Sequence, residues 1–167
     1  MSTQNQPLVG ILMGSASDWP VVQHAAKTLD ELSVPWEARV LSAHRTPDDA
    51  LEYAASARSR GIKVLVCAAG GAAHLAGVVS AKTLLPVLGI PMQAWSLDGL
   101  DSLLSMAQMP RGVPVGTLAI GKAGAVNAAL LAVAILALQD EDLYARYAAY
   151  REQKAEEIRA TKLPPPA

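Results

Sequence analysis

Cysteine is almost absent from this sequence, since Cys67 is the only one among 167 residues. A single thiol excludes an intrachain disulfide and a cysteine-based zinc cluster, and nothing marks an oxidising compartment, so we expect the cytoplasm as the location. Residues 1–6 are polar and lack the cationic start and apolar core of a signal peptide. Cys67 itself lies in an apolar stretch and is expected to be a small core residue, not a nucleophile.

Charged residues are also scarce. Fourteen Lys and Arg against fifteen Asp and Glu leave a formal net charge of −1, so there is no basic excess to neutralise many phosphates, and nucleic-acid binding is disfavoured. Charged residues make up 17% of the chain and hydrophobic residues 51%, whereas about 25% charged is usual. A domain of this size would display such an apolar surplus as exposed patches. We therefore expect a homo-oligomer.

Apolar runs long enough to span a bilayer are missing as well. The longest, residues 123–138, is interrupted by Gly124 and Asn127 and falls short of the roughly 20 residues that a spanning helix needs. The run is typical of a buried helix, and no membrane association is expected.

Short apolar runs alternate with helical patterns along the chain. Strands are expected at 8–13, 36–41, 64–68, 87–90 and 115–120. Helices are expected from position 18 or 19 to 32, from 46 to 61, in a short stretch after 74, and at 100–106, 124–138 and 140–159. This alternation predicts an α/β fold: a three-layer α/β/α sandwich with a central parallel sheet, flavodoxin-like or Rossmann-like, and an extra C-terminal helix. At roughly 150 residues per domain, we expect one domain at 8–160 between tails at 1–7 and 161–167.

Some local signals refine these expectations. Thr46, followed by Pro47 and with Asp49 three residues after it, is close to a capping box at a helix start. Pro86 and Pro91 bracket the fourth strand. The helical spacing of three tyrosines predicts a packing seam between helices; they are Tyr144, Tyr147 and Tyr150.

Polar residues gather where the predicted strands end. In an open parallel sheet, ligands bind beyond the carboxyl ends of the strands, so these residues should converge on one rim. They are Ser15, Ser17 and Asp18 after the first strand, Ser42, His44 and Arg45 after the second, and His74 after the third. Residues 108–112 are a candidate flap over the same rim.

The first of these turns, residues 14–18, combines a glycine, two hydroxyls and a helix start, which together suit a phosphate or ribose. It matches neither the dinucleotide fingerprint nor the NTPase P-loop. Ordinary turn and capping chemistry is the alternative, because Ser and Asp favour helix starts.

The second turn, residues 42–47, places His44 and Arg45 between a strand end and a proline-locked helix start. Histidine titrates near neutral pH and can both give and take a proton. Arginine can clamp a phosphate or carboxylate with two N–H bonds. The alternative is a solvent-exposed loop without a catalytic role.

The third turn holds His74 after a run of small residues, 68–73, which lets a flat ligand or another backbone approach closely. Tight helix–sheet packing with His74 as a helix cap is the alternative. The three histidines lie apart, without carboxylates at matching spacing, so no metal site is expected.

Four motifs occur together in the chain: Gly14-Ser15-Ala16-Ser17-Asp18, Ser42-Ala43-His44-Arg45-Thr46-Pro47, Ala69-Gly70-Gly71-Ala72-Ala73-His74-Leu75 and Gly112-Val113-Pro114-Val115-Gly116-Thr117. Their order and spacing resemble those of the PurE family, and the resemblance runs over about residues 9–159. It implies a 5-(carboxyamino)imidazole ribonucleotide mutase of purine biosynthesis, which moves a carboxyl group from the exocyclic nitrogen to ring carbon 4.

A second class in that family carboxylates aminoimidazole ribonucleotide directly with carbon dioxide. Its members typically have Lys at the position of Arg45 and lack the Ala-Ala-His stretch, so Arg45 and His74 favour the mutase. Two departures from the family pattern are Ala76, where Pro is usual, and Val78, where Met is common.

The resemblance also implies the roles of the site residues. His44 would be the general acid/base, and Ser15, Asp18 and Arg45 would bind substrate. Further members of the pocket would be Ser17, Ser42, Gly70, Gly71 and His74. The implied ligands are the ribonucleotide and carbon dioxide, with no metal or cofactor, and the implied assembly is a homo-octamer.

Two other hypotheses remain open at this point. A flavodoxin-like module could hold FMN at the same rim and would not need His44. The chain could also be an inactive structural homologue.

Overall fold

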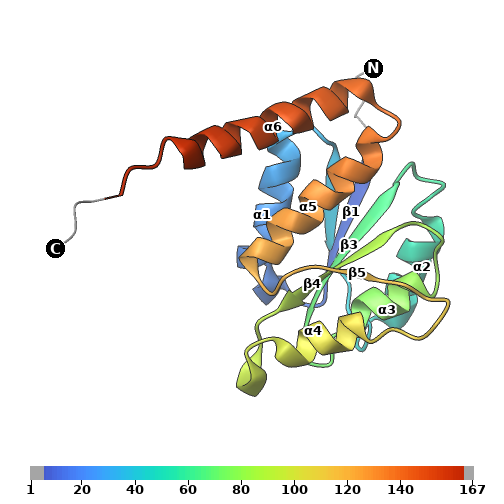
Figure 1. Cartoon of the computed structure of the whole chain (residues 1–167). Coiled ribbons are helices and arrows are strands. Elements are labelled where there is room, and N and C mark those ends of the chain that lie inside the picture. The colour runs from blue at the N-terminus through green and yellow to red at the C-terminus, as the bar shows by residue number, and fades with distance from the viewer. Residues whose placement is uncertain (1–5, 164–167) are drawn as a thin grey trace.

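Five parallel strands form the centre of the protein, whose computed structural model describes residues 6–163 (Figure 1). They are β1 (Val9–Met13), β2 (Trp36–Val40), β3 (Val64–Gly70), β4 (Val87–Met92) and β5 (Gly116–Thr117). Their order in the sheet, β2-β1-β3-β4-β5, is the flavodoxin-like order. The strand order reverses between β1 and β3, so the loops after these two strands diverge and leave a crevice.

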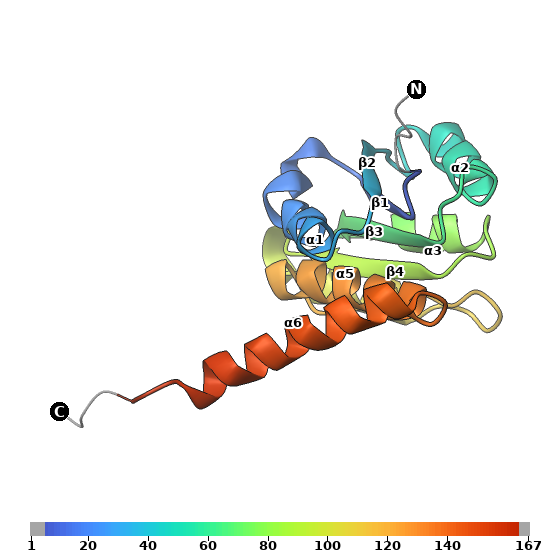
Figure 2. The same ribbon diagram turned by 90° about the horizontal axis from the view of Figure 1, so that it is seen from above.

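Helices cover both faces of the sheet (Figure 2). One face carries α1 (Trp19–Glu31) and α5 (Lys122–Ala137), with α6 (Glu141–Arg159) outside α5. The other face carries α2 (Pro47–Ser56), α3 (Leu75–Ser80) and α4 (Leu100–Ala107). Two short 3₁₀ helices, η1 (Ala16–Asp18) and η2 (Trp95–Leu97), follow β1 and β4. The predicted three-layer α/β/α fold is confirmed.

The strand β1 shows why the central strands are continuous apolar runs. Val9, Ile11 and Met13 pack into the cluster with α1 and α5, whereas Leu12 packs into the cluster with α2 and α3. A strand covered by helices on both faces has no solvent side, so apolar residues do not alternate with polar ones. Cys67 on β3 is buried in the second cluster, as predicted, and burial raises the pKa of its thiol.

The strand β4 runs through Pro91, which the sequence analysis placed outside it. Proline lacks an N–H, and the missing donor falls on the side of β5. Gly89 of β4 pairs with Thr117 of β5, and the Gly89 carbonyl accepts a hydrogen bond from Leu118 N–H. The next backbone N–H of β4 that would point toward β5 belongs to position 91, where proline has none. The ladder therefore stops, and the strand expected at 115–120 shortens to Gly116–Thr117.

The helix α2 begins at the predicted residue but differs in its cap and its end. Thr46 is the N-cap, yet its Oγ1 accepts a hydrogen bond from Ser42 N–H at 3.0 Å, so the predicted capping box is wrong. The helix ends at Ser56 instead of Gly61, and turns carry the chain to Gly61 at φ +94°.

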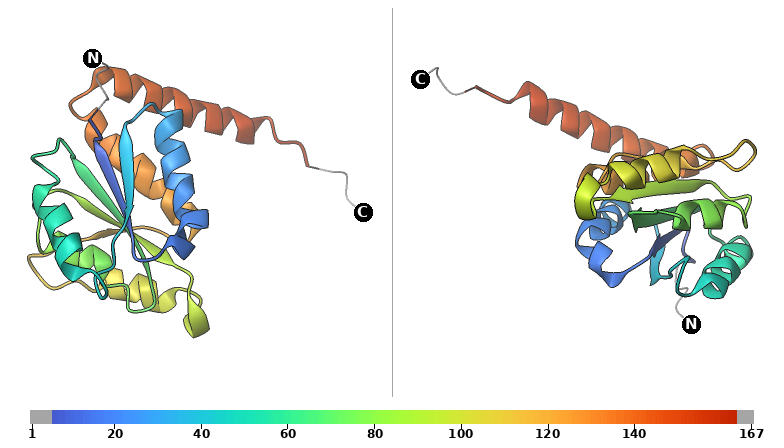
Figure 3. Two further views of the ribbon diagram at one scale, coloured as in Figure 1. Left: turned by 180° about the vertical axis from the view of Figure 1, so that it is seen from behind. Right: turned by 90° about the horizontal axis from the view of Figure 1, so that it is seen from below.

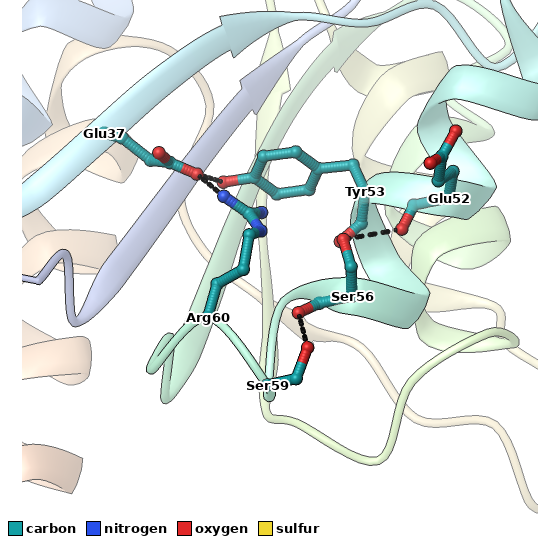
Figure 4. A network of polar contacts seen from close by, with 6 residues as sticks. All are labelled: Glu37, Glu52, Tyr53, Ser56, Ser59 and Arg60. Atoms are coloured by element: carbon teal, nitrogen blue, oxygen red, sulfur yellow. Dashed lines mark hydrogen bonds and ion pairs between the residues drawn. The ribbon is translucent and has the colours of Figure 1, made fainter.

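A polar cluster ties the C-terminal part of α2 to β2 (Figure 4). Tyr53 Oη donates to Glu37 Oε1 at 2.7 Å, and Arg60 donates to the same oxygen while its guanidinium lies 4.4 Å from the Tyr53 ring centre. Burial alone would raise the pKa of Glu37, but the two hydrogen bonds and the nearby arginine charges together lower that pKa. Gly10 leaves the space for this cluster, because a Cβ there would lie 2.5 Å from Tyr53 Oη.

The helix α6 packs on the body of the protein only through its first half. Leu143 is buried, Tyr147 and Tyr150 pack against the core, and Arg146 donates to the Leu32 carbonyl at 3.1 Å. The C-terminal half of α6 projects beyond the other helices (Figures 1 and 3). The tyrosine seam is thus confirmed for two of its three members, whereas Tyr144 is 61% exposed.

Within residues 6–163, no helix is long and apolar enough to cross a membrane. The division into a domain at 8–160 and two tails stays a prediction. Residues 1–5 and 164–167 of those tails lie outside the described residues.

Candidate active site

The turns after β1, β2 and β3 meet at the carboxyl edge of the sheet around a cavity of about 750 Å³. Eight of the nine predicted site residues line it: Ser15, Ser17, Asp18, Ser42, His44, Arg45, Gly70 and His74. The predicted convergence on one rim is therefore observed. The cause is the parallel arrangement, which brings all strand C-termini to one edge.

The first turn is held by its own hydroxyls. Ser15 Oγ accepts from Ser17 N–H at 3.2 Å and from the Ser17 hydroxyl at 2.8 Å, so Ser15 is the N-cap of η1. Asp18 follows at the start of α1. Burial raises the pKa of Asp18, and a backbone hydrogen bond with Ser15 and the nearby Arg45 charge oppose that rise. This carboxylate is thus held in a site that does not fully solvate it.

The second turn is organised by the Ser42 hydroxyl. Ser42 Oγ lies 3.4 Å from His44 N and 3.2 Å from Arg45 N, and it accepts from both. The Arg45 guanidinium reaches across to the first turn and donates to the Gly14 carbonyl at 2.8 Å. Arg45 Nε also lies 3.4 Å from Ser42 Oγ, so one cation joins the two turns. Arg45 lines the cavity, and a guanidinium there suits an anionic ligand.

The third turn meets the second through two imidazoles. His44 Nε2 lies 2.8 Å from His74 Nδ1, and the rings are nearly perpendicular, with centroids 4.9 Å apart. One of these nitrogens carries a hydrogen and the other accepts it, so the tautomers of the two rings are coupled. His74 is also the N-cap of α3, which begins at Leu75 although Ala76 replaces the usual proline.

Gly71 is the ninth predicted site residue, and it does not line the cavity. It is buried, with φ +65°, and a Cβ there would overlap the Trp95 ring. The small residues of this turn therefore admit a side chain of the chain's own η2 segment, the Trp95 ring. Gly71 N–H donates to the buried Ser102 Oγ at 2.9 Å, and that hydroxyl donates to the Met92 carbonyl at 2.8 Å.

The sequence analysis missed a fourth segment of the cavity lining. Met92, Gln93, Ala94 and Trp95 follow β4 and line the cavity beside the three predicted turns. The same carboxyl-edge rule, applied to the fourth strand, would have found them. They lack charged groups, which is why they escaped notice.

The segment at 108–112 does not cover this rim. It precedes β5, and Gly112 lines a second cavity of about 600 Å³ together with Ser80, Pro86 and Val87, next to the start of β4. The prediction that this segment covers the rim of its own chain is therefore wrong. A loop that precedes a parallel strand lies at the amino edge of the sheet, opposite the edge that holds the cavity.

An α/β sheet with paired histidines, an arginine and hydroxyls around a cavity at its carboxyl edge defines a small-molecule enzyme of the α/β class. The family model for AIR carboxylase matches residues 8–157. The N5-carboxyaminoimidazole ribonucleotide mutase of Bacillus subtilis (strain 168) is 60% identical over 92% of this chain and 94% of its own length. The mutase of the same name from Escherichia coli (strain K12) is 54% identical over 95% and 94%.

The crystal structure of Treponema denticola PurE superposes with a TM-score of 0.80 at 31% identity, covering 91% of this chain and 94% of that one. The chain belongs to the AIR carboxylase family. The expectation of a carboxyl-transferring mutase of purine biosynthesis is confirmed. The relatives support this reading over the FMN-binding module.

Proposed function

We propose that the chain converts 5-(carboxyamino)imidazole ribonucleotide to 4-carboxy-5-aminoimidazole ribonucleotide, with His44 as the general acid/base. The observation that carries this assignment is the meeting of His44, His74 and Arg45 in one cavity of a chain from this family. The names of relatives at 54–60% identity support the same substrate.

The reaction is an isomerisation whose protons balance. The carbamate C–N bond breaks and releases carbon dioxide, while His44 gives a proton to the exocyclic nitrogen. Ring carbon 4 then attacks the retained carbon dioxide and forms the new C–C bond. His44 takes the proton from carbon 4, which restores the aromatic imidazole and returns the histidine to its starting state.

The remaining cavity residues hold the ribonucleotide. Ser15, Ser17 and Asp18 offer hydroxyl and carboxylate partners near a helix start, and Arg45 offers a cation. Ser42, Gly70 and His74 shape the wall next to the reacting groups, and Gly71 supports that wall from behind the Trp95 ring. The amino-imidazole is already an electron-rich nucleophile, so the reaction is expected to need no metal or cofactor.

Retention of carbon dioxide is the main catalytic requirement. A trapped molecule reacts at an effective concentration far above bulk, which is worth several kcal/mol, and exclusion of water prevents its loss. In the single chain, His44, Arg45 and His74 are exposed at the rim. We propose that neighbouring copies in a homo-octamer cover this rim, in the cytoplasm.

The deciding experiment measures interconversion of the two carboxylated isomers without ATP while bicarbonate is varied. Wild type should turn over at a rate that does not depend on bicarbonate. His44→Asn should still bind aminoimidazole ribonucleotide but lose about 10²–10⁴-fold in kcat, whereas His24→Asn, on α1 outside the cavity lining, is the matched control. A rate that requires added bicarbonate would instead indicate direct carboxylation.

A further inference from the structure

We infer that Trp95 is a substrate-positioning residue whose indole provides one wall of the cavity, against which the flat aminoimidazole ring stacks. The inference rests on the proposed function, because that function supplies the aromatic ligand. Trp95 lines the same cavity as His44, Arg45 and His74. Neither the sequence motifs nor the names of the relatives assign it a role.

The backbone of Trp95 is held in a conformation that bulky residues rarely adopt. Its φ is +49°, and Asp98 and Gly99 in the same loop also have positive φ, at +50° and +90°. A large β-carbon-bearing residue in the left-handed region is strained, and such residues persist where the surrounding structure and function require them. In this conformation the Trp95 ring meets the third turn of the cavity at Gly71.

The ring has a rigid support on one side. It rests on Gly71, where a Cβ would collide with the indole. Gly71 is fixed in turn by its N–H bond to Ser102 Oγ, and the Ser102 hydroxyl is bonded to the Met92 carbonyl at the end of β4. Gly70 also packs closely, because a Cβ there would lie 2.9 Å from the Ala94 Cβ. The ends of β3 and β4 thus form one tight platform beneath the ring.

The rest of the ring is open. Trp95 is 83% exposed in the single chain, although indole is among the most favourable groups to bury. An apolar ring supported on one side at the edge of a polar cavity suits a flat, electron-rich ring, since offset stacking places two such surfaces in contact. The polar turns on the other sides of the cavity suit the sugar and phosphate.

The test compares two ligands that differ by the ring alone. Binding of aminoimidazole ribonucleotide and of ribose 5-phosphate is measured by calorimetry for wild type, Trp95→Ala, Trp95→Phe and Leu97→Ala. Leu97 is the matched control, because it is an exposed apolar residue of the same η2 helix that does not belong to the cavity lining. Thermal unfolding and light scattering accompany each variant.

Trp95→Ala should weaken binding of the ribonucleotide roughly three- to tenfold and leave ribose 5-phosphate unchanged. In turnover, KM should rise while kcat changes little. Trp95→Phe should restore most of the affinity, and Leu97→Ala should behave as wild type. Ribonucleotide binding should also change the tryptophan emission of wild type but not that of Trp95→Phe.

Three results for Trp95→Ala would each overturn the role of Trp95. They are an equal loss of affinity for both ligands, an unchanged affinity for the ribonucleotide, and a smaller assembly in which the ratio of the two ligand affinities is unchanged. In those cases wild type still turns over the carboxylated isomers. Failure of wild type itself to bind the ribonucleotide or to interconvert the isomers would instead reject the proposed function.

Discussion

His44 Nε2 and His74 Nδ1 lie 2.8 Å apart, although 30 residues separate them in the chain. The bond joins the turn after β2 to the turn after β3, two strands that β1 separates in the sheet. A histidine that must give and take one proton in each cycle benefits from a partner that fixes its tautomer and orientation. Under the proposed function, the pair would link proton transfer at His44 to the position of a second turn.

Removal of the His74 ring should slow the enzyme without abolishing it. We expect His74→Ala to lower kcat by about tenfold, the value of one hydrogen bond of about 1.4 kcal/mol, with a smaller change in KM. His74→Asn should restore part of the rate, because its amide can occupy the place of Nδ1. Steady-state kinetics measure both. The double variant with His44→Asn should be no slower than His44→Asn alone, and fully additive losses would contradict the pairing.

We expect the ionised Asp18 carboxylate to lower the stability of the enzyme without substrate. Its pKa is raised by burial, so the stability that it contributes is present below the ordinary carboxyl pKa and is lost as pH rises through the folded-state pKa. Asp18→Asn should therefore melt at a higher temperature than wild type at neutral pH. The difference in melting temperature should vanish in acid. Asp18→Asn should also bind the substrate more weakly than wild type. A lower melting temperature at neutral pH would show that the carboxylate stabilises the free fold.

Tyr53→Phe should destabilise the fold by about 1–2 kcal/mol, because it removes a hydrogen bond to the ionised Glu37. The pKa of Glu37 is lowered, so its contribution is present above the ordinary carboxyl pKa and is lost as pH falls through the lowered value. The effect of the variant should therefore shrink in strong acid. Urea unfolding across pH measures it, with the exposed Tyr144→Phe as the control. A cost that does not change with pH would contradict the role of Glu37.

The projecting half of α6 should dock on a neighbouring copy. Truncation after Asp140 should yield assemblies smaller than the wild type, as measured by light scattering. A chain that ends at Arg151 keeps Leu143, Tyr147 and Tyr150 on the core, so it should fold normally by circular dichroism and still assemble incompletely. An assembly of unchanged size for both truncations would reject this interface.

Local signals in the sequence predicted the layers and the rim. Apolar runs of strand length alternate with helical patterns, and chain connectivity then makes the sheet parallel and gathers the polar turns at one edge. Ser15, His44 and His74 could be found in this way, because each follows a strand directly. Trp95 also follows a strand, but an apolar residue in a turn carries no chemical signal.

Other features depend on which segments meet, and only the folded chain decides this. The course of β4 through Pro91 depends on which side of the strand faces β5, and the fate of the Thr46 hydroxyl depends on Ser42 lying within reach. The same holds for the bond between His44 and His74 and for the Trp95 ring on Gly71. Periodicity reports how one segment is solvated, whereas hydrogen-bond direction and close approach are relations between two segments. The sequence therefore determined which residues gather at the rim, and the tertiary structure decided how they pair.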